Sequence, residues 1–460
     1  MRTAIVGAGP TGLYLGIALA RRGHRVVLVD RDPGPSDAGR WERRGVMQFH
    51  HVHAFRQQAL KALEAEMPDV VESLLAAGAV PATQPAPGRL ELEQLEQPDQ
   101  ADHVVGLRCR RELFERVLRA TAQAEPGVQL RTGHAEELVE TGGRTTGVRI
   151  DGLTVDADLV LDATGRSGRL TRRWRGPAED HDCGFAYVSR QYQLHPGASN
   201  GPMNNPFGML AFYPGYVVLV VPQDNGALST LIGRASSDRD LSALRHQRAF
   251  DVAARTIPAL AAWTDPSRSR PITPVLPGAT LFNRYQSQLD HTGRPPLIGL
   301  LCVGDAVCTT NPAFGRGVST SLMQARYLVS LLHEHRRDLV TVSQAFDRWC
   351  VQAIRPWFAD HVDMDAQRRR RWAGHDIDLS RPLPSDLVVA AAGTDPRLMP
   401  VVGPYLAMEA LPGSLAVVQP QVRERYATGW RPPIPAGPSR DELADLVSRA
   451  VPEPSEPNAA

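Results

Sequence analysis

A glycine-rich loop near the N-terminus constrains the fold of this chain more than any other feature. Residues 7–12 (GAGPTG) follow a short apolar run at residues 3–6 and precede a segment with helical periodicity. A second β-branched run follows at residues 25–29, and Asp30 comes directly after it. In such a strand–helix–strand unit, the glycines permit a tight turn and the close approach of a pyrophosphate, and the acidic residue binds a ribose hydroxyl. The pattern therefore predicts a parallel sheet that binds a dinucleotide.

Two further kinds of structure follow along the chain. Apolar runs at residues 158–161 and 300–303 predict buried strands that return to the first sheet. Between residues 183 and 234, successive β runs are joined through residues 224–226 (DNG), which is a strong hairpin signal. We therefore expect an inserted antiparallel sheet, and beyond about residue 360 the pattern predicts helices.

The composition argues against several classes of partner. With 51 basic and 50 acidic residues the formal net charge is +1, so no long-range field attracts nucleic acid or an anionic membrane surface. No apolar stretch reaches the roughly twenty residues of a membrane-spanning helix. The five cysteines are odd in number and contain no C-x-x-C pair, which indicates free thiols in a reducing compartment, the cytoplasm. Small molecules are the expected partners.

A second motif, around residue 305, carries a family resemblance. The run at residues 300–303 leads into Gly304 and Asp305, and residues 311–317 (NPAFGRG) then precede a helical pattern. Together with the N-terminal loop, this arrangement resembles the flavoprotein monooxygenases of the para-hydroxybenzoate hydroxylase type. In that family the aspartate contacts the ribityl chain of FAD, and the helix start faces the isoalloxazine, where its dipole stabilises the anionic reduced flavin. The resemblance implies FAD as the cofactor.

The fold that the resemblance implies is α/β, with a Rossmann-like FAD-binding domain, an inserted antiparallel β-sheet substrate domain and a C-terminal helical region. We place the discontinuous FAD-binding domain at residues 1–79, 106–180 and 281–360. The substrate domain then comprises residues 80–105 and 181–280, and the helical region, which ends in a frayed tail, comprises residues 361–460.

The residues expected to bind FAD come from several segments. After the run at residues 158–161 the chain has Thr164-Gly165, where the family carries an Asp-Gly pair linked to both FAD and NAD(P)H. This departure leaves two routes for reducing the flavin: directly by NAD(P)H, or through a partner flavin reductase. The cofactor-binding candidates are Gly7, Gly9, Pro10, Thr11, Gly12, Asp30, Arg31, Arg43, Arg111, Asp162, Gly165, Gly304, Asp305, Pro312, Gly315, Arg316 and Gly317.

The segment from Gln48 to His53 holds the catalytic candidates Gln48, His51 and His53. It resembles the corresponding segment of actinobacterial FAD-dependent epoxidases of polyether biosynthesis. If the segment is strand-like, His51 and His53 share a face, and if it is helical, His50 and His53 do. A neutral imidazole there can hydrogen-bond the flavin or transfer a proton, whereas a histidine that caps the next helix is the structural alternative. Three histidines without a fourth ligand do not predict a metal site.

The activity implied by the resemblance is the transfer of one oxygen atom from a flavin C4a-hydroperoxide to an apolar small molecule, by hydroxylation or epoxidation. Dioxygen is the co-substrate, and the acceptor is expected to be a secondary-metabolite intermediate. The protein's part is to orient the substrate and exclude water. Aromatic residues of the β-rich segment are the candidates for the substrate pocket: Tyr187, Tyr192, Phe207 and Phe212.

Three alternatives remain open at this point. An FAD-dependent reductase or dehydrogenase of the geranylgeranyl reductase type would share the cofactor motifs but deliver hydride. A flavin-dependent halogenase is disfavoured, because halogenases rely on a Trp-x-Trp-x-Ile-Pro motif and on a lysine. The chain lacks this motif, and its sole lysine, Lys61, lies in the helical pattern after the histidines, at residues 52–67. A flavin-binding protein without activity is the third alternative.

Overall fold

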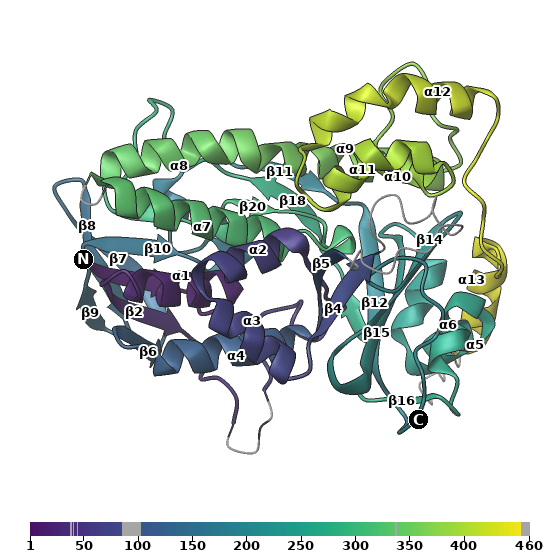
Figure 1. Ribbon diagram of the computed structural model, residues 1–460, viewed down its shortest axis with the longest axis horizontal. Helices are drawn as coiled ribbons and strands as arrows, with labels where there is room; N and C mark the ends of the chain where they lie inside the picture. The colour runs from purple at the N-terminus through teal and green to yellow at the C-terminus, as the bar shows by residue number, and fades with distance from the viewer. Residues whose placement is uncertain (37–38, 40, 44, 85–102, 336–337, 452–460) are drawn as a thin grey trace, which may run out of the picture.

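The computed structural model describes residues 1–36, 39, 41–43, 45–84, 103–335 and 338–451 (Figure 1). Its first core contains a five-stranded parallel sheet in the order β19-β10-β1-β2-β6. The strands are β1 (Arg2–Val6), β2 (Arg25–Asp30), β6 (Val128–Thr132), β10 (Leu159–Asp162) and β19 (Leu300–Cys302). Every residue of β10 is buried, as expected for a parallel strand covered on both faces. The predicted parallel sheet is confirmed.

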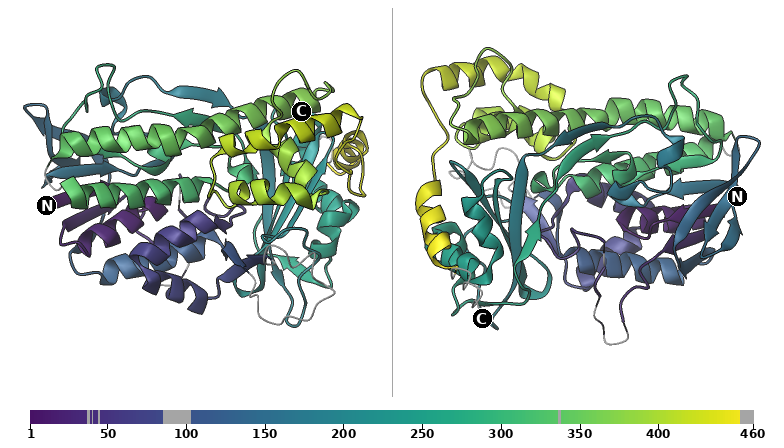
Figure 2. Two further views of the ribbon diagram at one scale, coloured as in Figure 1. Left: turned by 45° about the horizontal axis from the view of Figure 1, so that its top comes forward. Right: turned by 180° about the vertical axis from the view of Figure 1, so that it is seen from behind.

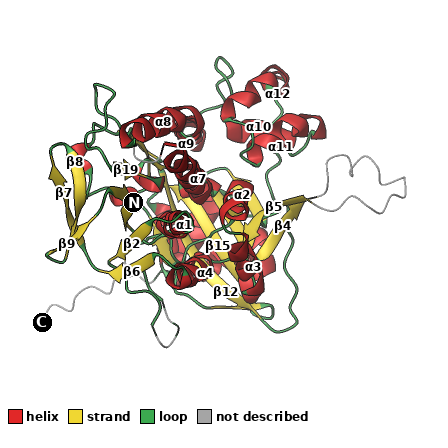
Figure 3. Cartoon of the chain, turned by 60° about the vertical axis from the view of Figure 1, so that its left-hand side comes forward, coloured by secondary structure: helices red, strands yellow, loops and turns green. Residues whose placement is uncertain are grey.

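Helices cover one face of this sheet, and a small antiparallel sheet covers the other (Figure 3). The helices are α1 (Pro10–Ala20), α2 (Gln57–Glu66), α3 (Pro68–Ala76), α4 (Arg111–Ala124), α7 (Gly317–His335) and α8 (Leu339–Ala353). The small sheet consists of β7 (Ala135–Thr141), β8 (Arg144–Ile150) and β9 (Leu153–Asp156). Apolar residues therefore alternate between two cores along each strand, with Ile5 packed under the helices and Val6 under the small sheet.

A six-stranded antiparallel sheet forms a second core. Its order is β13-β14-β15-β12-β16, and β17 also pairs with β12. The strands are β12 (Phe185–Leu194), β13 (Met209–Tyr213), β14 (Tyr216–Pro222), β15 (Ala227–Ala235), β16 (Ser269–Pro271) and β17 (Leu276–Gly278). Because β14 and β15 pair on either side of residues 224–226, the predicted hairpin is confirmed. One face of the sheet packs on α5 (Gln247–Thr256) and α6 (Pro258–Thr264).

Two three-stranded sheets complete the β structure of the described residues. One consists of β3 (Phe55–Arg56), β4 (Val80–Gln84) and β5 (His103–Arg108), and the other of β11 (Glu179–Asp182), β18 (Phe282–Tyr285) and β20 (Cys308–Thr309). Residues 52–56, which the spacing placed in a helix, are not helical. Phe55 and Arg56 instead pair with β5, and the Phe55 ring stacks on Phe114 at 4.0 Å between centroids. This pairing delays the start of α2 to Gln57.

Helices after residue 354 form a third core around Trp357, Tyr405 and Tyr426. They are α9 (Arg355–Trp372), α10 (Ser385–Ala392), α11 (Met399–Leu406) and α12 (Gln419–Ala427), at the same end of the molecule as the six-stranded sheet (Figure 2). The last helix, α13 (Arg440–Arg449), packs against α5 instead, through Leu443 and Val447.

The domain boundaries stay a prediction, and part of them lies outside the described residues. Residues 85–102, from the first half of the predicted substrate domain, and the predicted frayed tail at residues 452–460 are not described. Within the described ranges, no helix combines the length and the apolar character needed to cross a membrane.

Candidate active site

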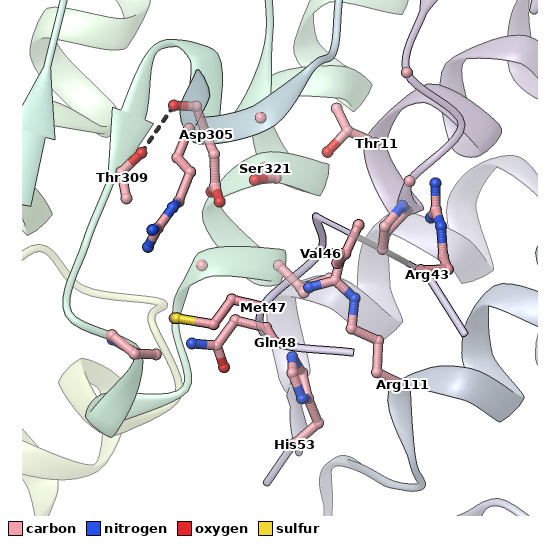
Figure 4. A pocket seen from close by; sticks show the side chains of 18 of the residues that line it. Thr11, Arg43, Val46, Met47, Gln48, His53, Arg111, Asp305, Thr309 and Ser321 are labelled. Carbon is pink, nitrogen blue, oxygen red and sulfur yellow. Dashed lines mark hydrogen bonds between the residues drawn. The ribbon is translucent and has the colours of Figure 1, made fainter. Parts of the chain in front are cut away.

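A cavity of about 560 Å³ lies where the carboxyl ends of the parallel strands face the six-stranded sheet (Figure 4). Residues at the ends of β1, β2, β10 and β19 line one part, and apolar residues of β13 and β14 line another. In open α/β sheets the ends of parallel strands are where ligands bind, because loops rather than paired backbone surround them. The cavity therefore joins the predicted dinucleotide loop to an apolar chamber.

The glycines of the N-terminal loop shape one wall of this cavity. Gly7 has a φ of +106°, and a Cβ there would lie 2.4 Å from the carbonyl oxygen of Ala163. A Cβ on Gly12 would lie 1.8 Å from the carbonyl oxygen of Gly7. A Cβ on Gly9 would meet nothing within 4 Å, and no side chain caps the start of α1, where Gly9 is the N-cap. The first helical N–H groups are thus open to the cavity, which fits a pyrophosphate.

Asp30 closes this wall through a charged cluster. Its carboxylate accepts the backbone N–H of Ala8 at 2.7 Å and pairs with Arg43 at 2.5 Å. Arg43 also pairs with the fully buried Glu115, which in turn pairs with Arg111 four residues earlier on α4. Burial lowers the pKa of Arg43, but the charges of Glu115 and Asp30 outweigh it and raise the pKa above its ordinary value. Three predicted residues, Asp30, Arg43 and Arg111, are therefore held together.

Glu115 organises this cluster, and the sequence reasoning missed it. The signal was present, because a glutamate between Phe114 and Leu118 stands on the buried face of an amphipathic helix. A buried carboxylate is rarely left without partners, and an arginine four residues before it is within reach along the helix.

Asp305 and the loop at residues 311–317 form the opposite wall. Burial raises the pKa of Asp305 to about 6, and its backbone carbonyl accepts the hydroxyl of Thr309 at 2.9 Å (Figure 4). Pro312, Gly315 and Gly317 line the cavity with it, and α7 begins at Gly317. The start of a long helix thus faces the cavity, as the second motif predicted.

A buried polar network holds this loop from the C-terminal side of the chain. Asn311 donates its side-chain amide to Asp365 of α9 at 2.8 Å, and its backbone N–H to Asn283 of β18 at 2.7 Å. Asn283 also donates to Asp365 at 2.8 Å, and Arg368 pairs with the same carboxylate. Asp365 therefore joins two segments that lie far from each other in the sequence.

Four predicted cofactor residues do not line the cavity. Arg316 turns away from it, because its guanidinium pairs with Asp360 at 2.8 Å and stacks on Trp357 and Tyr405. Asp162 is fully buried behind the loop, where it accepts hydroxyls of Thr164 and Thr171. Gly12 packs against the backbone of Gly7, and Gly304, with a φ of +73°, packs against the side chains of Thr11 and Ser321.

His53 faces the cavity, whereas His51 does not. The segment from Gln48 to His53 is a turn, so neither the strand nor the helix alternative applies. His53 Nδ1 lies 3.2 Å from the carbonyl oxygen of His51. Because a carbonyl oxygen can only accept a hydrogen bond, Nδ1 carries the ring proton and Nε2 is left as an acceptor. Burial lowers the pKa of His53 to about 3, which keeps the ring neutral. His51 instead contacts the hydroxyl of Ser189 at 2.5 Å, and Gln48 donates to Tyr187 at 2.8 Å.

Of the four aromatic substrate candidates, Phe207 lines the cavity. Tyr187 lies behind Gln48 on the cavity side of the six-stranded sheet, and Tyr192 points to the opposite face, into the core with α5 and α6. Phe212, on the edge strand β13, is 52% exposed. Strand alternation separates Tyr187 from Tyr192, since residues of one strand separated by an odd number face opposite sides. Apolar lining residues that the sequence reasoning missed are Leu210, Leu219, Val221, Leu281, Phe282 and Phe314.

Comparison with known proteins agrees with this geometry. The family described as FAD binding domain matches residues 1–339. The chain belongs to the FAD binding domain family. This match confirms the FAD-binding family and FAD as the cofactor, which the two motifs predicted. Monooxygenase activity of the para-hydroxybenzoate hydroxylase type stays a prediction. The greater closeness to actinobacterial epoxidases stays a prediction.

Individual relatives of this FAD binding domain protein are distant. Protein Rv3254 of Mycobacterium tuberculosis is 25% identical over 448 residues, 86% of each chain. The solved structure of the flavin-dependent brominase Bmp2 has a TM-score of 0.61 at 15% identity, over 93% of this chain and 99% of that chain. The structure of pqsL, a probable FAD-dependent monooxygenase from Pseudomonas aeruginosa, has a TM-score of 0.58 at 15% identity, over 81% and 98%. These structural likenesses show the fold.

Proposed function

We propose that this FAD-binding protein is a monooxygenase that inserts one oxygen atom from dioxygen into a largely apolar small molecule, by hydroxylation or epoxidation. The observation that carries the proposal is a cavity shared between a cofactor cradle and an apolar chamber. Reduced FAD, once bound, supplies the activation of dioxygen. The residues that would hold it are Gly9, Pro10 and Thr11 at the pyrophosphate, Asp30 at a ribose, Asp305 at the ribityl chain, and Pro312, Gly315 and Gly317 at the isoalloxazine.

Exclusion of water is the first task of this chain's own residues. Phe207, Leu210 and Val221 line the chamber from the six-stranded sheet side, and Phe314 lines it from the opposite wall. An apolar lining orients an apolar substrate and keeps water away from the reacting atoms, where it would divert the activated oxygen to hydrogen peroxide.

His53 is the proposed catalytic residue. His53 lines the cavity, and its Nε2, which is left as a neutral acceptor, can hold the proton that moves during oxygen transfer. His53→Ala should keep its FAD but form less product per reduced flavin, with the difference appearing as hydrogen peroxide. Unchanged coupling at normal flavin content would assign His53 to structure.

The decisive test of the function is isotopic. Purified protein with bound FAD is reduced and mixed with ¹⁸O-labelled dioxygen and a panel of candidate substrates, including unsaturated and aromatic compounds. Mass spectrometry should find one labelled oxygen atom per product molecule. A product that gains hydrogen and no label would instead support the reductase or dehydrogenase alternative.

The reductant and the location complete the proposal. We expect NAD(P)H alone to reduce the flavin slowly and a separate flavin reductase to support turnover better; the motive is Thr164 in place of the family's aspartate. Rapid bleaching of the flavin by NADPH in a stopped-flow instrument, with substrate present, would overturn this expectation. The cysteines, all free and buried, support a reducing location, the cytoplasm.

Halogenation has less support than oxygen insertion, despite the fold shared with the brominase. Lys61 does not line the cavity: it is about half exposed and pairs with Glu409 at 2.6 Å. Adding bromide to the isotopic test checks this directly, since a halogenase would form a brominated product without label from dioxygen.

A further inference from the structure

Arg56 lines the cavity at the start of α2 without a carboxylate partner. Its Nε and Nη2 atoms donate to the carbonyl oxygen of Phe314 at 3.1 and 2.8 Å, and Nη1 donates to the carbonyl oxygen of Leu406 at 3.0 Å. Its guanidinium carbon lies 5.6 Å from the ring centroid of Phe207. Carbonyl oxygens and a ring face orient the guanidinium but do not neutralise its charge. Five N–H groups are available on a guanidinium, so two remain for a ligand.

The other arginines of the cavity differ from Arg56. Arg43 and Arg111 pair with Glu115, and Arg43 also pairs with Asp30. Arg31 and Arg169 are exposed, so water solvates their charge. Arg166 is half-buried, but it lies close enough to Asp305 to influence the pKa of that carboxyl. Within the described ranges, Arg56 is therefore the half-buried cavity arginine without an acidic neighbour.

Burial makes this unpaired charge costly. The pKa of Arg56 is lowered to about 10, by desolvation first and then by repulsion from Arg316. The group still carries its proton at neutral pH, because its pKa remains well above 7. A cation that is partly withdrawn from water is ordinarily paired, and one that is left without a counter-charge in a binding cavity favours an anionic ligand.

We propose that Arg56 binds an anionic oxygen group, a carboxylate or an ionised phenol, on a substrate that is otherwise apolar. The proposal rests on the proposed function for its view of the cavity as a substrate site. The two free N–H groups supply charge-assisted hydrogen bonds, and Phe207 covers the apolar part beside them. An anchored anion would hold the substrate in one orientation within the chamber.

Paired probes test this with a binding readout. The carboxylates benzoate, 2-naphthoate and biphenyl-4-carboxylate, each with its neutral amide, are titrated by calorimetry into FAD-loaded wild-type, Arg56→Met and Arg56→Lys proteins. The wild type should prefer the carboxylates over the amides. Arg56→Met should weaken carboxylate binding roughly 10- to 100-fold, the effect of losing hydrogen bonds to a charged group, and leave amide binding almost unchanged. Arg56→Lys should keep part of the preference.

Lys61→Met is the matched control, because Lys61 is a cation five residues later, within α2, and its exposed side chain pairs with Glu409. It should leave both affinities unchanged. Equal weakening of acid and amide in Arg56→Met, or loss of its FAD, would assign Arg56 to structure or cofactor and overturn the proposal. Should Arg56→Met fail to fold, the wild-type preference decides alone, and its absence overturns the proposal. Carboxylate preference without labelled product would refute the monooxygenase function but not this role of Arg56.

Discussion

The two walls of the cavity are built in different ways. The N-terminal wall comes from residues 7–12 and Asp30. Apart from the approach of Ala163 to Gly7 and the pairing of Arg43 with Asp30, its arrangement follows from backbone shape within the first thirty residues. The opposite wall, at residues 304–317, is held by Asn283 and by Asp365 of α9. Asp365 lies beyond the residues that the family match covers, 1–339. The comparison teaches that one half of the cofactor cradle is local, whereas the other depends on helices specific to the C-terminal part of the chain.

The largest loss of stability is expected from a substitution in the N-terminal wall. In this wall, one glycine tests the fold and another tests cofactor binding. Gly12→Ala places a Cβ against the Gly7 carbonyl and should destabilise the protein by about 4 kcal/mol, since backbone cannot yield cheaply. Gly9→Val places its side chain in open space and should retain the melting temperature but lose FAD. Flavin absorbance and thermal melting measure both. Full flavin occupancy in Gly9→Val would contradict the assignment of this loop as the pyrophosphate-binding site.

The second prediction concerns the wall held from α9. Asp365→Asn removes the charge that pairs with Arg368, and its NH₂ group faces the donating side-chain amides of Asn283 and Asn311. The change should cost about 2 kcal/mol of stability. FAD affinity should also fall, because the loop at residues 311–317 loses its tie. Asp363→Asn, two residues earlier in α9 and in a more exposed pair with Arg381, is the control and should cost under about 1 kcal/mol. Equal flavin affinity in the two variants would contradict the dependence of the second wall on α9.

A third prediction uses the titration of Asp305. Its pKa in the folded protein, about 6, lies above the ordinary value of 3.8, so ionisation of this carboxyl disfavours the folded state. The stabilisation that the protonated Asp305 carboxyl gives to the folded state is therefore fully present below pH 4 and is lost as the pH rises through 6. Asp305→Asn should remove this loss, when melting temperatures of the FAD-free proteins are compared between pH 4 and 7. His51 and His53 act in the opposite direction in both proteins, so the difference between the two curves isolates Asp305.

The smallest effect is expected on the substrate side. Phe207→Ala should lower coupling and release more hydrogen peroxide, because Phe207 lines the chamber. Phe212→Ala should change neither coupling nor stability beyond about 0.5 kcal/mol, since Phe212 is 52% exposed. A peroxide assay with both variants reports the contrast. Loss of coupling in Phe212→Ala alone would contradict the proposed chamber and indicate that the substrate binds at the outer edge of β13.

Sequence reasoning was most successful where function depends on backbone. Gly7, Gly9 and Asp305 line the cavity, and they could be predicted because turns, close approaches and helix starts impose residue types at fixed spacing. Arg316 stands within the second motif but does not line the cavity, because its side chain pairs with Asp360, 44 residues later. No local pattern reports such a partner.

The sequence by itself determined the parallel sheet, the inserted antiparallel sheet and the family, since these follow from short-range periodicity and from motifs of contiguous residues. Only the tertiary structure decided which polar groups meet. It buried Glu115 between Arg43 and Arg111, tied Asn311 to Asp365, and left Arg56 facing the cavity without a counter-charge. The physical reason is that the pairing and desolvation of a charge depend on every element packed around it, whereas a turn or a strand depends on its own few residues.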